Sequence, residues 1–387
     1  MKRLTACLTL RLLPGIGPIT AQRLVAAYGS PEAIFDSKTI LEQPPNERLL
    51  TLLRKGSRVQ KEVKSIEQWI RKEKLRPLLW GTEEYPLALA RCPDAPLVLF
   101  CRGNLSWESR RWVAVVGTRR PSTYGVESCQ ALLKELAPFH PVIVSGLAYG
   151  VDAVAHKAAL KEGMDTVACL PQALGLPIYP APHQGLAEKI RQQGALVSDF
   201  IPQQGFERGH FVQRNRLIAG LCQATLVIES GATGGSLITA NFASQYDREL
   251  FALPAPVHSA KSKGCHSLIQ LQQAKLLDSI DIVVETLGWG NTKKTTQQSL
   301  PLDLSEAEEK VYFFLLQKGK QDLDFLAKSL ALTISETAIL LMQLEMKKRY
   351  ALCLANVLRC VSTQLCFGLL RAPRWLWRVH DRLLWQG

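Results

Sequence analysis

Four short segments of the chain combine glycine with arginine, serine or asparagine, which are residue types suited to binding phosphate. Glycine lets a phosphate approach backbone N–H groups, and an arginine side chain can donate to two phosphate oxygens at once. One segment also places an aromatic ring beside its arginines, where the ring could stack on a base. Together the segments predict a binding site for an extended polyanion. The residues expected in this site are Gly117, Thr118, Arg119, Arg120, Ser145, Gly146, Phe211, Arg214, Asn215, Arg216, Gly234, Gly235 and Ser236.

The elements that must position these residues alternate along the chain between short apolar runs and amphipathic stretches. This pattern predicts an α/β fold with a parallel, Rossmann-like sheet covered by helices on both faces. Such a sheet binds ligands beyond the carboxyl ends of its strands, where the four segments fall. The expected strands are residues 113–116, 142–145, 166–170, 196–199, 225–229 and 249–253. The expected helices are residues 125–136, 151–162, 186–192, 214–221 and 236–246.

Catalytic machinery is hard to assemble from the same region. The first turn lacks the G-x-G-x-x-G pattern of dinucleotide binding, and the chain has no phosphate-binding G-x-x-x-x-G-K-[ST] loop. Asp152 and His156 lie one helical turn apart and could pair, although this spacing more often gives a helix N-terminal Asp and a locally satisfied His. The ten cysteines include no C-x-x-C pair that would indicate a zinc site. We therefore expect a binding protein with no catalytic residue, cofactor or metal.

The overall charge supports a polyanionic partner. The chain has 47 Lys and Arg against 34 Asp and Glu, a net charge of +13, which attracts nucleic acid through its long-range field and counterion release. Its apolar runs are shorter than the roughly 18 residues of a membrane span. The weakly apolar N-terminus has no clean cleavage site, so we expect a cytoplasmic protein that does not insert into membranes.

The core is flanked by segments of different character. Residues 8–35 predict two helices joined by a Pro-Gly-Ile-Gly turn, either a helix-hairpin-helix that contacts DNA phosphate or a plain corner between helices. A single charged helix is expected over residues 47–74. Ser305 and Glu308 have capping-box spacing before three helical segments and a short hairpin, the order of a winged helix. The final tail is basic and aromatic, and suits a docked apolar helix, a DNA-stacking segment or a membrane-surface segment. The expected divisions are residues 1–75 helical, 76–287 Rossmann-like, 288–301 linker, 302–361 winged helix and 362–387 tail.

Five segments in order and spacing resemble the DprA (Smf) family of DNA-processing proteins: VAVVGTRRPSTYG, VSGLAYGVDAVAHKAAL, RNRLIAGL, LVIESGATGGSLITANFA and SKGCHSLI. The resemblance implies a sterile-alpha-motif-like N-terminal domain, an extended Rossmann fold and a C-terminal winged helix. It also implies single-stranded DNA binding, loading of RecA recombinase during natural transformation, and a homodimer. The resemblance implies that Arg119 and Arg214 bind phosphates through their guanidinium groups. It also implies that Gly146 and Gly235 let the backbone lie close to DNA, and that Phe211 stacks on a base.

The chain departs from the family pattern in three places. Tyr149 stands where family members commonly have arginine, and Pro171-Gln172 where they have glycines. Val212-Gln213 replaces a Pro-Arg pair, which removes a positive charge beside the expected groove. We therefore expect weaker DNA binding than is typical of the family.

Two other functions compete with this interpretation. Nucleotide phosphoribohydrolases of the lysine-decarboxylase-like type share the sheet edge, but they use a P-G-G-x-G-T turn with a catalytic glutamate and arginine, whereas residues 232–236 read Ala-Thr-Gly-Gly-Ser. A transcriptional regulator would read duplex DNA through the winged helix. Acidic side chains in that segment would repel a duplex: Asp303, Glu306, Glu308, Glu309, Asp322 and Asp324.

Overall fold

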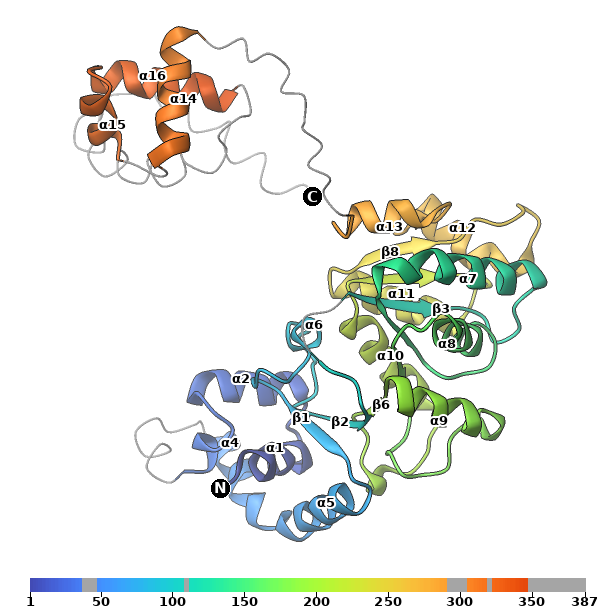
Figure 1. Cartoon of the computed structure of the whole chain (residues 1–387). Helices are drawn as coiled ribbons and strands as arrows, with labels where there is room; N and C mark the ends of the chain where they lie inside the picture. The colour runs from blue at the N-terminus through green and yellow to red at the C-terminus, as the bar shows by residue number, and fades with distance from the viewer. Residues whose placement is uncertain (37–46, 108–110, 291–304, 319–321, 347–387) are drawn as a thin grey trace, which may run out of the picture. The chain divides into compact units, whose positions relative to one another are not determined.

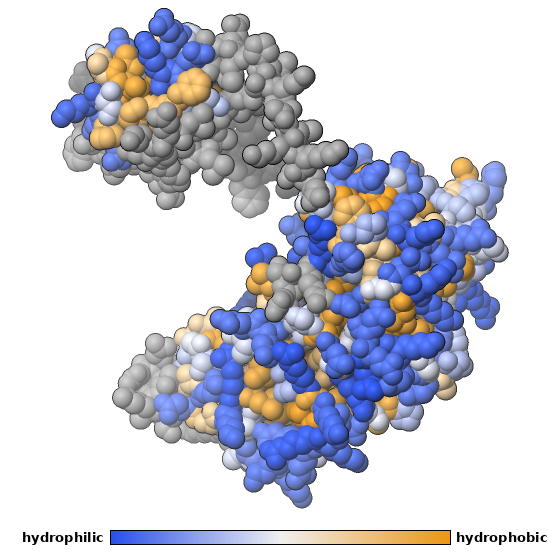
Figure 2. Space-filling view, viewed as in Figure 1, coloured by the Kyte–Doolittle hydropathy of each residue, from blue (hydrophilic) through white to orange (hydrophobic). Residues whose placement is uncertain are grey.

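A computed structural model describes residues 1–36, 47–107, 111–290, 305–318 and 322–346. By its internal contacts the chain divides into two compact units, Met1–Asn291 and Thr292–Gly387. The face of the first unit that Figure 2 presents is largely hydrophilic, with its apolar side chains in separate small patches. The expected tail, the expected hairpin and most of the expected linker lie outside the described residues.

The first unit is built on a nine-stranded sheet (Figure 1), and all six predicted strands are present in it. The order is β1-β2-β6-β5-β4-β3-β7-β8-β9, and every pair from β6 to β9 is parallel. The three strands not predicted are β1, β2 and β9; β1 and β2 extend the sheet with antiparallel pairs. The bounds are β1 Arg76–Leu79, β2 Val98–Gly103, β3 Trp112–Val116, β4 Val142–Ser145, β5 Thr166–Cys169, β6 Ala195–Ser198, β7 Ala224–Val227, β8 Glu249–Ala252 and β9 Lys275–Leu276.

The sheet is covered on both faces because its strands are apolar on both sides. Along β3 the pleat sends Val113 and Val115 into one core, and Ala114 and Val116 into another. The first core is covered by α7 (Thr123–Leu136), α8 (Val151–Lys161) and α13 (Ile280–Thr286). The second is covered by α6 (Leu87–Ala90), α10 (Gly209–Leu221), α11 (Gly235–Gln245) and α12 (Lys263–Gln270). This arrangement confirms the predicted α/β class.

The N-terminal helices share a third hydrophobic core with the antiparallel end of the sheet. Leu8 and Ile66 from these helices join Phe100 of β2, Leu196 of β6 and Ile190 of α9 in one buried cluster. The helices are α1 (Arg3–Leu12), α2 (Pro18–Tyr28), α4 (Glu47–Arg54) and α5 (Gln60–Lys72), and the cluster also includes α9 (Gln184–Gln193). The first 75 residues therefore pack as part of the same compact unit as the sheet.

A single charged helix over residues 47–74 was expected, and the structure has two. A short 3-10 turn, Lys55–Ser57, separates α4 from α5. Gly56 in this turn is buried, and a Cβ atom there would lie 3.3 Å from the ring of Phe35. Close packing at the turn accounts for a break that apolar periodicity alone did not predict.

The second unit contains the three helices expected from the sequence, α14 (Glu306–Lys318), α15 (Leu323–Ser329) and α16 (Ile334–Met346). The predicted capping box is present: the backbone N–H of Ser305 donates to the Glu308 carboxylate at 2.6 Å, and the Glu308 N–H to Ser305 Oγ at 3.4 Å. No single helix in the described ranges is long and apolar enough to cross a membrane, and only the pair of α15 with residues 334–344, bent by 105°, passes that test together.

Candidate nucleic-acid interface

A hollow of ≈ 810 Å³ lies at the carboxyl ends of the central strands, where the strand order reverses. The chain runs outward from β3 to β6 and then returns to β7 on the other side of β3, so the loops after β3 and β7 diverge. We call this hollow the switch-point pocket. Of the predicted residues, its lining includes Gly117, Thr118, Arg119, Phe211, Arg214, Asn215, Gly234, Gly235 and Ser236.

The loop after β3 is held against the start of α8. The Thr118 N–H donates to the backbone oxygen of Glu229 at 2.7 Å, and the Thr118 oxygen accepts from Val151 N–H at 3.1 Å. Gly150 adopts a φ of +79°, and a Cβ atom there would lie 2.2 Å from the Thr118 oxygen. Only glycine fits this position, which brings two of the predicted loops into contact.

Arginine side chains at the tip of this loop are exposed to solvent. The Arg119 guanidinium lies 5.4 Å from the centre of the Phe211 ring, a cation–π distance, and both residues line the pocket. The structure places Arg120 beside them, also exposed but outside the pocket lining. The exposed Arg208 lines the pocket and was not predicted.

The loop after β4 is fixed from within by Asp152. Its carboxylate accepts from the N–H groups of Gly146, at 3.1 Å, and Ala148, at 3.3 Å. Burial raises the pKa of Asp152, and the Arg214 charge and these hydrogen bonds oppose that rise. Ser145, another predicted residue, is fully buried and donates from Oγ to the Val115 oxygen at 2.6 Å. Ser145 and Gly146 thus lie behind the pocket lining and support it.

Arg214 supplies a fixed positive charge to the pocket. Its side chain lines the pocket although the residue is only 3% exposed, and Nη1 donates to the backbone oxygens of Gly146, at 2.5 Å, and Cys169. A Cβ atom on Gly146 would lie 2.6 Å from the guanidinium, so glycine is needed to admit it. Burial lowers the pKa of Arg214, and Asp152 opposes this shift. The guanidinium is held by protein carbonyls rather than extended into solvent.

Arg216 lies in a different environment from the one expected. Its guanidinium pairs with Asp199 and, at 3.8 Å, with Asp94, and it is not among the residues that line the pocket. Asp94 also accepts from the Tyr246 hydroxyl at 2.6 Å. α10 begins at Gly209, earlier than predicted, and residues two apart on a helix point in nearly opposite directions. The pair Arg214 and Arg216 therefore does not converge on one ligand.

The loop after β7 ends at the N-terminus of α11. The amide of Asn215 donates to the Gly235 oxygen at 3.3 Å, and Ser236 Oγ donates to Ser230 Oγ at 2.8 Å. Gly234 precedes the helix and Gly235 opens it, and both line the pocket without a side chain that would cover the first turn. The N-terminal N–H groups of a helix favour an anion, so this end of the pocket suits a phosphate.

An aromatic cluster stands at the mouth of the pocket. The rings of Tyr179, Phe206 and Phe211 lie 5.2 to 5.6 Å apart in all three pairings. Tyr179 is 43% exposed and Phe206 is 47% exposed. Only Phe211 was predicted, because Tyr179 and Phe206 lie in loops that sequence periodicity does not place. No sequence pattern indicates them, and only the fold shows that these large aromatic side chains are exposed beside the pocket.

Asp152 and His156 do not form a catalytic pair. Nδ1 of His156 lies 2.7 Å from Thr166 Oγ1, and that hydroxyl itself donates to the Ile143 oxygen at 2.8 Å, so Nδ1 carries the proton. Burial lowers the pKa of His156 to about 3, which keeps the ring neutral. The expected helix N-terminal Asp is present in the first turn of α8, whereas His156 is bonded to Thr166 of β5 and its buried Nε2 has no hydrogen-bond partner. Within the described ranges, no group of three His, Cys, Asp or Glu side chains is placed to hold a metal ion.

The fold and the pocket together define a Rossmann-like α/β protein with an open pocket at the switch point of its sheet. Residues 76–288 match the model of the DNA recombination-mediator protein A family, and the chain belongs to this family, also called DprA or Smf. The resemblance stated from its sequence segments is thereby confirmed.

Several relatives are similar over much of the chain. DNA processing protein DprA of Streptococcus pneumoniae is 40% identical over 195 residues, 50% of this chain and 68% of that protein. Protein Smf of Escherichia coli is 35% identical over 270 residues, 69% of each. The X-ray structure of the pneumococcal protein superposes with a TM-score of 0.61 at 30% identity, covering 74% of this chain and 98% of that one. The chain spans 61% of the length of its Mycobacterium tuberculosis relatives.

Proposed function

We propose that the chain binds single-stranded DNA in the switch-point pocket and does not catalyse a reaction. The aromatic cluster beside the pocket carries this proposal. Tyr179 and Phe206 are exposed and Phe211 is half-buried, and the three rings lie next to two exposed arginines and a helix N-terminus. Unpaired bases stack on such rings while cations and N–H groups hold the phosphates.

A single strand fits these features better than a duplex or a free nucleotide does. In a duplex the bases are stacked on each other, so their faces are not open to side chains. Three cations line the pocket, Arg119, Arg208 and Arg214, and they suit several phosphates better than the single phosphate of a nucleoside monophosphate. Asp152, which lines the pocket, accepts from loop N–H groups, and Glu229, which precedes the lining residue Ser230, accepts from Ser122. These bonds argue against a general base in this state of the protein.

The further role that we propose follows from the family. A member of the DNA recombination-mediator family would protect incoming single strands and load RecA recombinase onto them during natural transformation. A homodimer would present two pockets to one strand and raise its effective affinity. The winged-helix segment would serve as a docking module for protein or for DNA.

A binding assay tests the proposed function. Wild-type protein should bind labelled oligo-dT in preference to a duplex of equal length, and the affinity should fall as salt rises. The double variant Arg119→Ala, Arg208→Ala should lose about two phosphate contacts, which lowers the log–log salt slope by about 1.4 for a single strand. The matched control is Arg71→Ala, Lys72→Ala, which also removes two exposed cations, here from α5.

Two outcomes would overturn the proposal. Unchanged oligo-dT binding by the double variant would remove the pocket from the DNA site. Release of free base from a nucleoside monophosphate by wild-type protein would instead support the phosphoribohydrolase alternative.

A further inference from the structure

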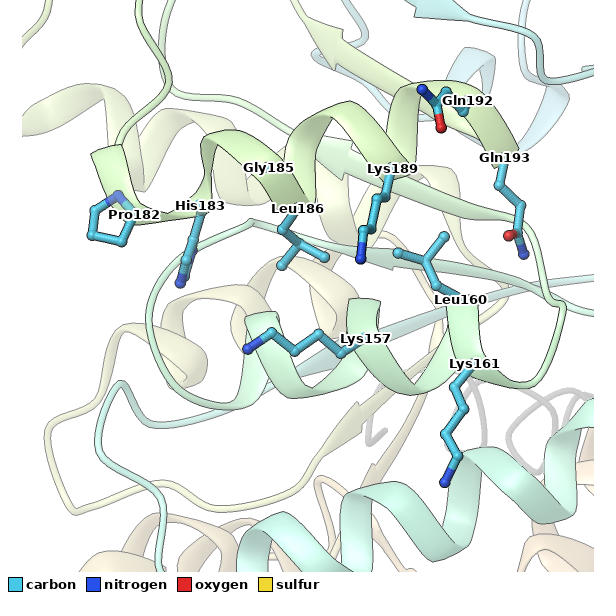
Figure 3. A pocket seen from close by; sticks show the side chains of 10 residues that line it. All are labelled: Lys157, Leu160, Lys161, Pro182, His183, Gly185, Leu186, Lys189, Gln192 and Gln193. Atoms are coloured by element: carbon cyan, nitrogen blue, oxygen red, sulfur yellow. The ribbon is translucent and has the colours of Figure 1, made fainter.

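A second hollow, of ≈ 960 Å³, lies between α8 and α9 (Figure 3). Both helices belong to the first compact unit, and the hollow is open to solvent along their length. Lys157 and Lys161 line it from α8 and Lys189 lines it from α9, and Figure 3 shows the Lys161 side chain pointing away from α9. We call it the lysine groove.

The three lysines give the groove an uncompensated positive charge. All three are exposed, and none forms an ion pair with a carboxylate in the described part of the chain. The nearest acid along α9, Glu188, is paired with Arg191 and does not line the groove. A lysine ammonium is a mobile point charge that binds phosphate without demanding one geometry. The groove is therefore suited to a flexible polyanion.

Apolar side chains form the surface between these charges. Leu160 and Leu186 lie between the lysines, and Figure 3 shows Lys189 pointing from α9 toward α8 beside them. Pro182 and His183 close the end of the groove where α9 begins. Alternating charge and apolar surface matches the alternation of phosphate and sugar along a nucleic-acid strand.

Only one short loop separates the groove from the switch-point pocket. Ala148 of this loop lines the pocket, and His183 lines the groove. Nδ1 of His183 donates to the Leu147 oxygen at 2.9 Å, and the His183 ring lies 5.2 Å from the ring of Tyr149. Tyr149 is 44% exposed, so an aromatic ring stands at the crossing between the two hollows.

We propose that the lysine groove binds the backbone of the same single strand after it leaves the switch-point pocket, with Tyr149 stacking on a base at the crossing. The proposal rests on the proposed function, and it adds a second binding segment with its own residues. Lys157 and Lys189 lie on the two facing helices and would contact successive phosphates, and Lys161 lies one helical turn beyond Lys157 along α8. Contiguity with the pocket favours a strand over an acidic protein as the occupant.

The test compares two lengths of oligo-dT, about six and about fifteen nucleotides, within the range of single-strand site sizes. The triple variant Lys157→Gln, Lys161→Gln, Lys189→Gln should bind the short oligomer like wild type. It should bind the long one about 10- to 100-fold more weakly at 0.1 M salt, with a salt slope lower by about 2. The matched control replaces three exposed lysines of α5, Lys61, Lys64 and Lys72, with glutamine.

A second measurement does not depend on the variants. Acetylation of wild-type protein, read by mass spectrometry, should show the three groove lysines protected by the long oligomer and not by the short one. The lysines of α5 should react equally in both samples.

The outcomes separate this proposal from the proposed function. Unchanged long-oligomer binding by the triple variant overturns the groove while short-oligomer binding still supports the pocket. Equal loss on both lengths, or loss in the control, assigns the effect to net charge and also overturns it. A change in self-association alone, measured by sedimentation, would show that the groove binds another protein surface instead. Failure of wild-type protein to bind either oligomer would remove both proposals.

Discussion

The switch-point pocket and the lysine groove share helix α8 but present charge in opposite ways. In the pocket the Arg214 guanidinium is buried, bonded to two carbonyl oxygens and set behind a glycine that admits it. In the groove, Lys157, Lys161 and Lys189 extend into solvent without a described acidic partner. A fixed charge contributes to the fold as well as to binding, whereas a mobile one contributes mainly to binding and to its dependence on salt.

The largest expected effect is a loss of stability when the buried Arg214 is substituted. Arg214→Ala leaves the Gly146 and Cys169 oxygens without their donor and Asp152 without a nearby positive charge. Loss of one partner from a buried, hydrogen-bonded charge cluster costs about 3 to 5 kcal/mol of unfolding free energy. Urea unfolding of the full chain measures it.

Lys189→Ala is the matched substitution in the groove and should change the same quantity by less than about 0.5 kcal/mol. Equal stability of the two variants would contradict the distinction between fixed and mobile charge.

The next effect concerns α8 itself, through His156. Its pKa is about 3 in the folded chain and about 6.5 when unfolded, so protonation favours unfolding. The stability that this shift contributes is complete above about pH 6.5 and is lost as pH falls toward 3, at up to about 1.4 kcal/mol per pH unit. We expect the free energy of unfolding, measured with urea, to be about 2 kcal/mol lower at pH 5 than at pH 7 because of His156 alone.

His156→Gln should flatten that part of the pH profile, because the amide can donate to Thr166 and does not titrate. His140→Asn, an exposed site with a φ of 48° that asparagine tolerates, should leave the profile unchanged. Parallel profiles for wild type and His156→Gln would show that the buried ring does not sense acid.

The smallest expected effect tests the contribution of the aromatic cluster to DNA binding. Tyr179→Ala should weaken binding of short oligo-dT about tenfold, within the 1 to 3 kcal/mol measured per stacked base. Tyr179→Phe should restore it, since the ring and not the hydroxyl makes the contact. An abasic oligomer should bind wild type and Tyr179→Ala alike, and a tenfold difference there would assign the loss to phosphate contacts instead.

The sequence predicted the parts of the fold that repeat a pattern. Each of the six strands from β3 to β8 is a short apolar run followed by a helix, and all were found within two residues. β1 was not predicted because Pro77 interrupts it, and β9 because two residues carry no periodicity. The break at Gly56 depends on contact with Phe35, which lies far from it in sequence.

The sequence predicted where the loops of the candidate site lie better than it predicted where their side chains point. The glycine-rich loops converge as expected because strand ends meet at one edge of a parallel sheet. Arg216 points away from the pocket because residues two apart on a helix lie on nearly opposite sides, a consequence that the expected helix over residues 214–221 already carried. Tyr179 and Phe206 come from irregular loops, whose approach to Phe211 only the folded chain defines.

The shared core of the first unit has a consequence for the order of synthesis. The apolar faces of α1 and α5 pack against Phe100 of β2 and Leu196 of β6, the latter made more than 100 residues after these helices. During synthesis on the ribosome, the apolar faces of α1 and α5 stay partly uncovered until β2 and β6 have been made. Truncation before β6 should therefore yield an aggregating fragment rather than a separate N-terminal domain. The last strand that the helices need, and not their own length, sets when they can fold.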